Sequence, residues 1–125
     1  MIDIKKNWFE LKNKPLSKKE KEKLYIVYNP ITKLTKIGIT VNIDRRIQEL
    51  ENSSGISLIL SMYIVLEKGV DESAGYIEKF LHDNFKEKRK RGEWFKLSLK
   101  DFAVIRSFLY AIDGLYIYDY NLQKK

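Results

Sequence analysis

Two short strands followed closely by a helix are the feature that most constrains how this chain folds. Residues 24–28 and 36–40 are rich in β-branched and aromatic side chains, and Asn29-Pro30 interrupts the chain between them. An antiparallel hairpin with a loop of roughly five residues is the simplest structure for this pattern. Asn42 then caps a helix. The apolar residues of this helix recur at i, i+4 and i+7 and are Ile43, Ile47 and Leu50.

The middle of the chain predicts one strong strand and one long helix. Ser57–Leu66 is nearly continuous in apolar residues, which favours a central strand buried on both faces. Asp71–Arg91 has acidic residues at its start and basic residues at its end, as the helix dipole favours. Gly92 is placed to stop this helix. The residues expected on its buried face are Ala74, Ile77, Leu81 and Phe85.

Three short elements complete the prediction. Glu93–Leu97 is expected to form a short strand, and Ser98 or Asp101 caps a further helix. The inward-facing residues of that helix are Phe102, Ile105, Phe108 and Leu109. After the turn at Asp113-Gly114, residues 115–118 are expected to form an edge strand.

Composition narrows the classes of protein and site. The chain has 125 residues, 44% of them hydrophobic and 33% charged, which is a globular composition sufficient for one domain at residues 23–125. It has no cysteine and a single histidine, so disulfides, thiolate metal sites and multi-histidine zinc sites are excluded. No apolar stretch approaches the ~20 residues needed to span a bilayer, so no membrane partner is expected. The first residues lack the apolar core of a secretory signal, and we expect a cytoplasmic protein, including the cytoplasm of a virus-infected host cell.

The net charge of +7 is concentrated in two segments. Residues 1–23 have eight lysines and four acidic residues, and residues 84–100 have seven basic and two acidic residues. Residues 24–83 have six basic and eight acidic residues, so the basic segments flank a mildly acidic middle. Nucleic acids are natural partners for such a distribution, although solubility alone also accounts for it.

Residues 1–22 are polar and lysine-rich and are expected to form an N-terminal arm. Its apolar cluster contains Trp8 and Phe9, through which the arm docks on the domain or waits for a protein partner. Ser17 and Glu20 fit a capping box, but at most one or two helical turns fit before the first strand.

Several residues are of the types that handle phosphates and metal ions. Arg46 lies beside the apolar stripe of the first helix, where a guanidinium can reach the rim of the sheet and hold a phosphate; a solvated helix arginine is the alternative. Glu78 lies on the flank of the long helix and can hold Mg²⁺, or it can pair with a neighbouring charge. His82 shares that face as a candidate base or supporting partner, or as an ordinary structural histidine.

A phenol and a lysine come from the two hairpin strands. Tyr25 and Lys36 can lie close together, and a cation beside a phenol lowers its pKa, which would suit a general base; alternatively Tyr25 packs and Lys36 faces solvent. Further cations are expected to contact nucleic-acid phosphates, although the run at 86–91 is first a helix end. These candidate contacts are Arg45, Lys86, Lys88, Arg89, Lys90 and Arg91.

The spacing of these residues resembles the GIY-YIG endonuclease superfamily. Lys23-Leu24-Tyr25 takes the place of GIY and Lys36-Ile37-Gly38 the place of YIG, so lysine replaces the first glycine and the second tyrosine. Thr40 and Arg46 fall where the family has its threonine or serine and its arginine. The later motifs, Glu78-x-x-Leu81-His82 and Gly92-Glu93-Trp94-Phe95, are similar to a branch with phage proteins and the meiotically up-regulated gene family, where KIG commonly replaces YIG.

The resemblance covers about residues 23–97 and implies both a fold and an activity. The implied fold is α+β, with a three-stranded antiparallel central sheet flanked by helices. The implied activity is cleavage of a nucleic-acid phosphodiester with Mg²⁺ or Mn²⁺, DNA ranking ahead of RNA. Tyr25 would be the base or its helper, Arg46 would stabilise transition-state charge, and Glu78 would be the metal ligand.

Two other functions remain open from the sequence. One is a nucleic-acid-binding module that keeps the fold but has weak or no catalytic activity, which the lysine at position 36 and the lysine-rich arm favour. The other is a protein-interaction domain that contacts its partner through Trp8 and Phe9.

Overall fold

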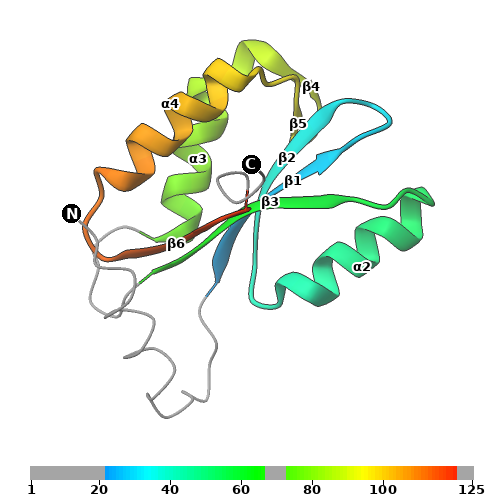
Figure 1. Cartoon of the computed structure of the whole chain (residues 1–125), viewed down its shortest axis with the longest axis horizontal. Coiled ribbons are helices and arrows are strands. Elements are labelled where there is room, and N and C mark those ends of the chain that lie inside the picture. Colours follow the sequence, from blue (N-terminus) through cyan, green and yellow to red (C-terminus); the bar gives the residue numbers. More distant parts are fainter. Residues whose placement is uncertain (1–21, 67–72, 121–125) are drawn as a thin grey trace.

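The computed structural model describes residues 22–66 and 73–120, which form one antiparallel sheet with helices on both sides (Figure 1). The strands are β1 (Lys23–Asn29), β2 (Leu34–Thr40), β3 (Ile59–Leu66), β4 (Arg89–Arg91), β5 (Trp94–Phe95) and β6 (Leu115–Asp119). The helices are α2 (Ile43–Ser54), α3 (Ala74–Asn84) and α4 (Leu99–Tyr110), with a 3₁₀ helix, η1, at Lys86–Lys88. The expected arm lies outside the described residues apart from Glu22.

The six strands follow the order β4-β5-β2-β1-β3-β6, and every neighbouring pair is antiparallel. The α+β class is confirmed, but the three-stranded sheet is wrong. Strands β2, β1 and β3 form only the centre of the sheet. Strand β6 pairs with β3 along its whole length, and the short β4–β5 hairpin extends the sheet beyond β2.

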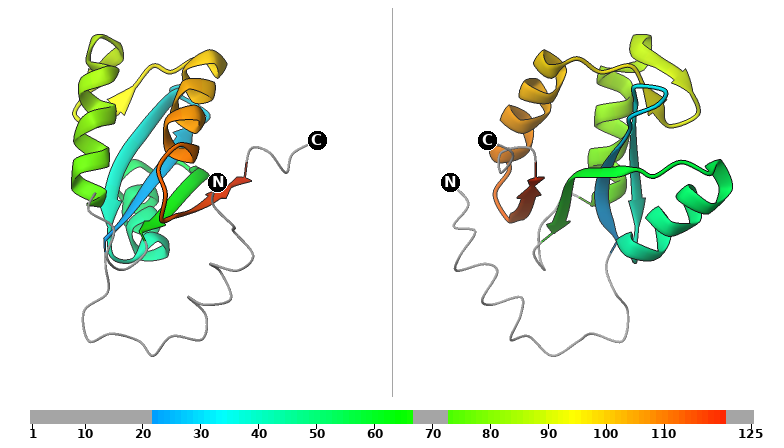
Figure 2. Two further views of the ribbon diagram at one scale, coloured as in Figure 1. Left: turned by 90° about the vertical axis from the view of Figure 1, so that its left-hand side faces the viewer. Right: turned by 45° about the vertical axis from the view of Figure 1, so that its right-hand side comes forward.

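The two faces of the sheet have different surroundings. Helices α3 and α4 cover one face, while α2 lies on the other side (Figures 1 and 2). The hydrophobic core lies under α3 and α4, where alternate strand residues such as Leu24, Ile37 and Ile64 meet both helices. Helix α2 has no fully buried side chain.

The predicted hairpin and the helix after it are confirmed. The loop between β1 and β2 closes when Asn29 Oδ1 accepts hydrogen bonds from the N–H groups of Ile31 (2.9 Å) and Thr32 (3.1 Å). Helix α2 begins as expected, because Asn42 Oδ1 accepts from the N–H of Arg45 at 3.0 Å. It ends at Gly55, whose φ of 72° is the left-handed conformation of a helix C-cap.

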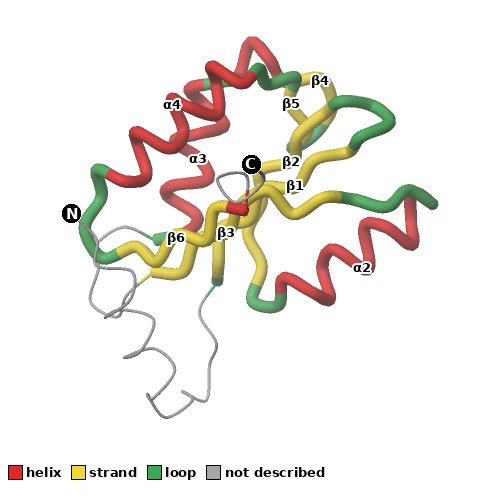
Figure 3. The backbone as a smooth tube through the Cα atoms, in the orientation of Figure 1, coloured by secondary structure: helices red, strands yellow, loops and turns green. Residues whose placement is uncertain are grey.

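The long helix predicted over 71–91 is wrong at its C-terminal end, and residues 71–72 lie outside the described residues. The buried stripe is confirmed, but α3 ends at Asn84. Residues 86–91 instead form η1 and β4, because the carbonyl of Lys88 accepts from the N–H of Lys96 at 2.8 Å and β4 pairs with β5 (Figure 3). Gly92, with φ of 52°, belongs to the β4–β5 turn and does not stop a helix.

The predicted helix near the C-terminus and the edge strand after it are both confirmed. Ser98 and Asp101 form a reciprocal capping box at the start of α4. Asp101 also accepts two hydrogen bonds of 2.6 Å from the ammonium of Lys88, which ties η1 to α4. Burial by itself raises the pKa of Asp101, but the bonds from Lys88 and Ser98 outweigh it and hold that pKa below its usual range.

None of the helices within residues 22–66 and 73–120 is both long and apolar enough to cross a lipid bilayer.

We expect Asp101→Ala to lower the free energy of unfolding by about 1–3 kcal/mol, because it removes a helix cap and a charged hydrogen-bond partner together. Urea unfolding followed by circular dichroism measures this change. Asp113→Ala, at an exposed aspartate after α4, is the matched control and should change it by less than about 0.5 kcal/mol. Equal effects of the two substitutions would contradict the role of Asp101.

Candidate active site

The backbone of Ile37 organises the candidate site. Strand β5 pairs with β2 only at Thr35 and Lys36, so the edge of β2 beyond them needs other partners. The N–H of Ile37 donates to the carbonyl of Glu93 at 3.2 Å, and the carbonyl of Ile37 lies 2.8 Å from Nε2 of His82. One residue of β2 thus fixes both the β4–β5 turn and helix α3 at the same point.

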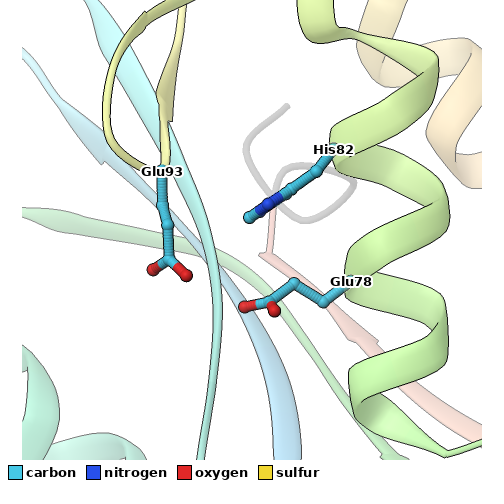
Figure 4. A group of neighbouring side chains, drawn as sticks. All are labelled: Glu78, His82 and Glu93. Carbon is cyan, nitrogen blue, oxygen red and sulfur yellow. The ribbon is translucent and has the colours of Figure 1, made fainter.

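Three side chains with metal-binding atoms converge beside this point. Glu78 and His82 extend from α3 toward Glu93, which comes from the β4–β5 turn (Figure 4). One ligand atom from each residue lies within 4.8 Å of the other two. Residues 78 and 82 are one helical turn apart, so they share the face of α3 that meets β2. The cluster therefore joins two elements that are separate in the sequence.

The hydrogen bond at His82 fixes its tautomer. A carbonyl oxygen can only accept, so Nε2 of His82 carries the proton and donates it to Ile37. In the neutral ring, Nδ1 is then the nitrogen with a free lone pair. The ring also packs against Phe95, with the two ring centroids 5.0 Å apart. His82 thus holds α3 against β2, while Nδ1 can accept a proton or bind a metal ion.

The surroundings of Glu78 disfavour the charged form of its carboxylate. Its Oε2 atom is buried and has no hydrogen-bond partner among the described residues. Burial, and then the negative charge of Glu93, raises the pKa of Glu78 to about 7, although Lys36 lowers it. A buried oxygen without a partner, beside a second carboxylate, suits a hard cation that prefers oxygen ligands. The residues present therefore fit Mg²⁺ or Mn²⁺.

Lys36 holds Glu93 in place. Its ammonium lies 2.8 Å from Oε1 of Glu93, and the Lys36 side chain is only 8% exposed. The same ammonium lies 5.7 Å from the ring centroid of Trp94, within reach of a cation–π interaction. Lys36 therefore pairs with a carboxylate, and Arg46 is the cation that bonds to Tyr25.

The ring of Tyr25 lies directly over Gly38. These residues face each other in the β1–β2 register, and Tyr25 is 1% exposed. A Cβ atom at position 38 would lie 2.6 Å from the Tyr25 hydroxyl oxygen and 2.7 Å from Cζ, closer than real Cβ contacts occur. Position 38 therefore requires glycine for space and not for backbone conformation.

Tyr25 and Arg46 form a hydrogen-bonded pair. Burial raises the pKa of Tyr25, and the bond to Arg46 with its positive charge opposes this shift. The charges of Glu93 and Glu78 raise it further, which places the phenol in the same electrostatic environment as the carboxylates. The bond to Tyr25 raises the pKa of Arg46, whose guanidinium also lies 3.3 Å from Oε1 of Glu49.

The structure thus brings Lys36, Glu78 and His82 together with Glu93 at the edge of β2. Tyr25 and Arg46 interact with each other, and the charges of Glu93 and Glu78 act on the phenol. The cations expected to contact nucleic-acid phosphates stay a prediction. Lys88 bonds to Asp101, and Arg89 lies over the ring of Phe95 with its guanidinium carbon 5.3 Å from the centroid. The remaining cations are exposed on η1, β4 and α2 and are Lys86, Lys90, Arg91 and Arg45.

Glu93 is the site residue that the sequence reasoning did not select. The sequence did contain a pointer to Glu93, because this residue follows Gly92 in the Gly-Glu-Trp-Phe motif that the resemblance singled out. Its role depends on the left-handed Gly92 in the turn and on the bond between its carbonyl and Ile37. Neither can be seen without the three-dimensional pairing of β5 with β2.

Comparison with known proteins gives the family. The model of the T5orf172 domain matches residues 16–109. The chain belongs to the T5orf172 domain family. This family falls within a group of phage-associated nucleases. No curated protein and no solved structure matches the chain significantly.

We expect Gly38→Ala to displace the ring of Tyr25 and to lower the free energy of unfolding by about 1–3 kcal/mol, because the added methyl group overlaps the phenol. Thermal unfolding and the near-ultraviolet circular dichroism of tyrosine measure both effects. Gly75→Ala makes the same change on α3, where the nearest atoms lie 3.9 Å and 4.0 Å away, and should be neutral or stabilising. A neutral Gly38→Ala would contradict the close packing.

Glu78 should make the metal-free protein less stable as the pH rises. Its pKa is about 7 in the folded protein and 4.5 as the reference value, so between these values the folded state binds more protons than the unfolded state. Stability therefore falls from pH 5 to pH 8, and Glu78→Gln should remove this part of the fall. Urea unfolding in EDTA at both pH values measures it.

Glu87→Gln, at an exposed carboxylate of η1, makes the same chemical change as a control. Parallel pH profiles for the wild type and Glu78→Gln would show that burial of Glu78 has no energetic effect.

Proposed function

We propose that this chain is a divalent-metal-dependent endonuclease that hydrolyses nucleic-acid phosphodiester bonds by chemistry of the GIY-YIG type. The observation that supports the proposal is the cluster of Glu78, His82 and Glu93, together with the Tyr25 phenol, which is bonded to Arg46 and feels the charges of both carboxylates. These groups come from β1, α2, α3 and the β4–β5 turn. Membership in the T5orf172 family supports a nuclease or nucleic-acid-binding function in general.

Arg46 supplies the positive charge for the scissile phosphate. Its side chain is 41% exposed, so it reaches solvent while its bond to Tyr25 fixes its direction. Negative charge grows on the phosphate oxygens as the transition state forms, and a preorganised cation stabilises this charge more than it stabilises the substrate. Arg46 therefore acts as the transition-state stabiliser.

Glu78 and Glu93 would hold the cation, with His82 Nδ1 as the third donor. A bound Mg²⁺ or Mn²⁺ supplies charge neutralisation at the phosphate and at the leaving oxygen. Glu78 would contribute its Oε2 atom, which has no hydrogen-bond partner among residues 22–66 and 73–120. Lys36 keeps the Glu93 carboxylate directed at the cluster. His82 keeps α3 at a fixed distance from β2 through its bond to Ile37.

Tyr25 handles the proton of the attacking water. In the metal-free protein its pKa is raised by burial and by the two carboxylates, so it is a neutral phenol. Neutralising Glu78 and Glu93 removes part of the cause of that shift, while Arg46 continues to lower the pKa. The phenol thus loses its own proton more readily when the carboxylates are neutralised, and the phenolate that results can accept the proton of the attacking water.

Incubation with plasmid DNA, single-stranded DNA and RNA in Mg²⁺ or Mn²⁺ should give cleavage that EDTA abolishes, with DNA as the first substrate to examine. Glu78→Gln and Arg46→Ala should each lower the cleavage rate by about 100-fold or more, because they remove a cation ligand and a transition-state charge. Gel electrophoresis of a time course measures the rates.

Arg45→Ala is the matched control for Arg46→Ala. It removes the same charge from the neighbouring exposed position of α2, where the loss of one expected phosphate contact should lower the rate by about threefold or less. No cleavage by the wild type with either ion, or equal rates for the Arg45 and Arg46 variants, would exclude the proposed enzyme.

A nucleic-acid-binding module without cleavage is the second candidate function. The observation that favours it is the buried Lys36, whose ammonium already neutralises Glu93 at 2.8 Å. Such a module binds with an affinity that falls steeply with salt concentration and leaves the strands intact. Binding titrations at several salt concentrations, run beside the cleavage assay, separate the two functions.

A further inference from the structure

A cavity of about 470 Å³ opens between the β2–α2 connection and strand β3, outside the carboxylate cluster. This volume is within the range of small-ligand pockets. Its lining residues are Lys23, Val41, Asn42, Ile43, Asp44, Leu60, Tyr63 and Tyr120. None of these residues has a role in the candidate active site described above.

Tyrosine rings form one wall of this cavity. Tyr63 stacks on Tyr118, with ring centroids 4.4 Å apart and an interplanar angle of 13°, and Tyr120 lies 6.1 Å from Tyr63. Burial, followed by the neighbouring Tyr120 and Tyr118, raises the pKa of Tyr63 above its usual range. The phenol of Tyr63 is therefore neutral at physiological pH, and its ring offers a flat apolar surface with a polar tip.

The cavity lining also includes hydrogen-bonding groups of both kinds. Asn42 uses its Oδ1 atom to cap α2, so its amide N–H groups remain as donors to a ligand. Asp44 supplies a carboxylate acceptor two residues later and lies close enough to affect the pKa of Tyr63. Lys23 also lines the cavity, but its ammonium already donates to the carbonyl of Val41 at 2.9 Å and its charge is offset by Asp44, so the lining has no net positive charge to hold a phosphate. A planar group with both hydrogen-bond donors and acceptors on its edge matches Asn42, Asp44 and the ring of Tyr63 better than a phosphate does.

The cavity lies next to the candidate active site. The carbonyl of Asn42 accepts from the N–H of Arg46 at 3.1 Å, so the cavity wall and Arg46 share the first turn of α2. Tyr63 faces Tyr25 directly in the β1–β3 register, and side chains paired in this way are about 5 Å apart at Cβ. A ligand in the cavity is therefore next to the turn of α2 that carries Arg46.

We propose that this cavity binds an unpaired nucleobase of the strand whose phosphate lies at Arg46, with the base stacked on Tyr63 and its edge bonded to Asn42 and Asp44. The proposal rests on the proposed function, because it supplies that site with a substrate class: single-stranded or locally unpaired nucleic acid. The edge that Asn42 and Asp44 contact is the one that base pairing occupies, so a paired base cannot make these bonds.

Binding of two fluorescein-labelled single strands of equal length tests the proposal, one with mixed bases and one in which every nucleotide is abasic. Both strands have the same number of phosphates, so the contribution of the phosphates to the binding free energy is the same for the two strands and cancels in the comparison. With Glu78→Gln protein, which prevents cutting, the mixed-base strand should bind about tenfold more tightly, the size of one stacking contact. Fluorescence anisotropy measures both affinities.

Variants in the cavity wall should reduce this preference selectively. Tyr63→Leu should lower it to less than about threefold, whereas Tyr110→Leu, at an exposed tyrosine of α4, should leave it unchanged. If Tyr63→Leu does not fold, Asn42→Asp replaces it, because aspartate keeps the helix cap and removes only the amide donor.

The outcomes separate the two proposals. Equal affinity for the mixed-base and abasic strands overturns the base-binding cavity, whether or not the wild-type protein cleaves DNA. Base-preferring binding that depends on Tyr63, by a wild-type protein that cuts no strand, supports the cavity and overturns the nuclease.

Discussion

The two backbone hydrogen bonds at Ile37 are the constraint on which the candidate site depends. A free strand edge must satisfy its N–H and carbonyl groups, and β2 does so with the carbonyl of Glu93 and the ring of His82. The same two bonds bring a carboxylate from the β4–β5 turn beside a carboxylate one helical turn before His82. The need to complete a strand edge thus also assembles the cluster of metal-binding atoms.

Packing on the opposite face depends on the next residue of β2. Because Gly38 has no side chain, the ring of Tyr25 crosses over it and its hydroxyl reaches Arg46. Any larger residue would push the phenol away from the guanidinium. Neighbouring residues of one strand, Ile37 and Gly38, therefore position the carboxylates and the phenol respectively. Two adjacent residues of β2 thus determine where both the carboxylates and the phenol lie.

Local signals predicted the hairpin and the starts of α2 and α4, because caps and turns depend on a few neighbouring residues such as Asn42 and Ser98. The end of α3 could not be predicted in this way. The run from Lys86 to Arg91 has the charge pattern of a helix end. Its backbone instead pairs with a later segment, because the N–H of Lys96 donates to the carbonyl of Lys88 and β4 pairs with β5. These contacts stabilise the chain more than further helical turns would. Glu93 escaped selection for the same non-local reason.

The carboxylate cluster also has a cost to stability, which bears on the function of Lys36. Two carboxylates within 4.8 Å repel each other, and the pKa of about 7 for Glu78 records both that repulsion and its burial. A fold selected for stability alone would replace one of them or pair both. Lys36 pairs only Glu93, and Glu78 Oε2 stays without a partner in the described part of the chain. Such an arrangement is typical of a functional site, and under the proposed function a bound cation would supply the missing partner.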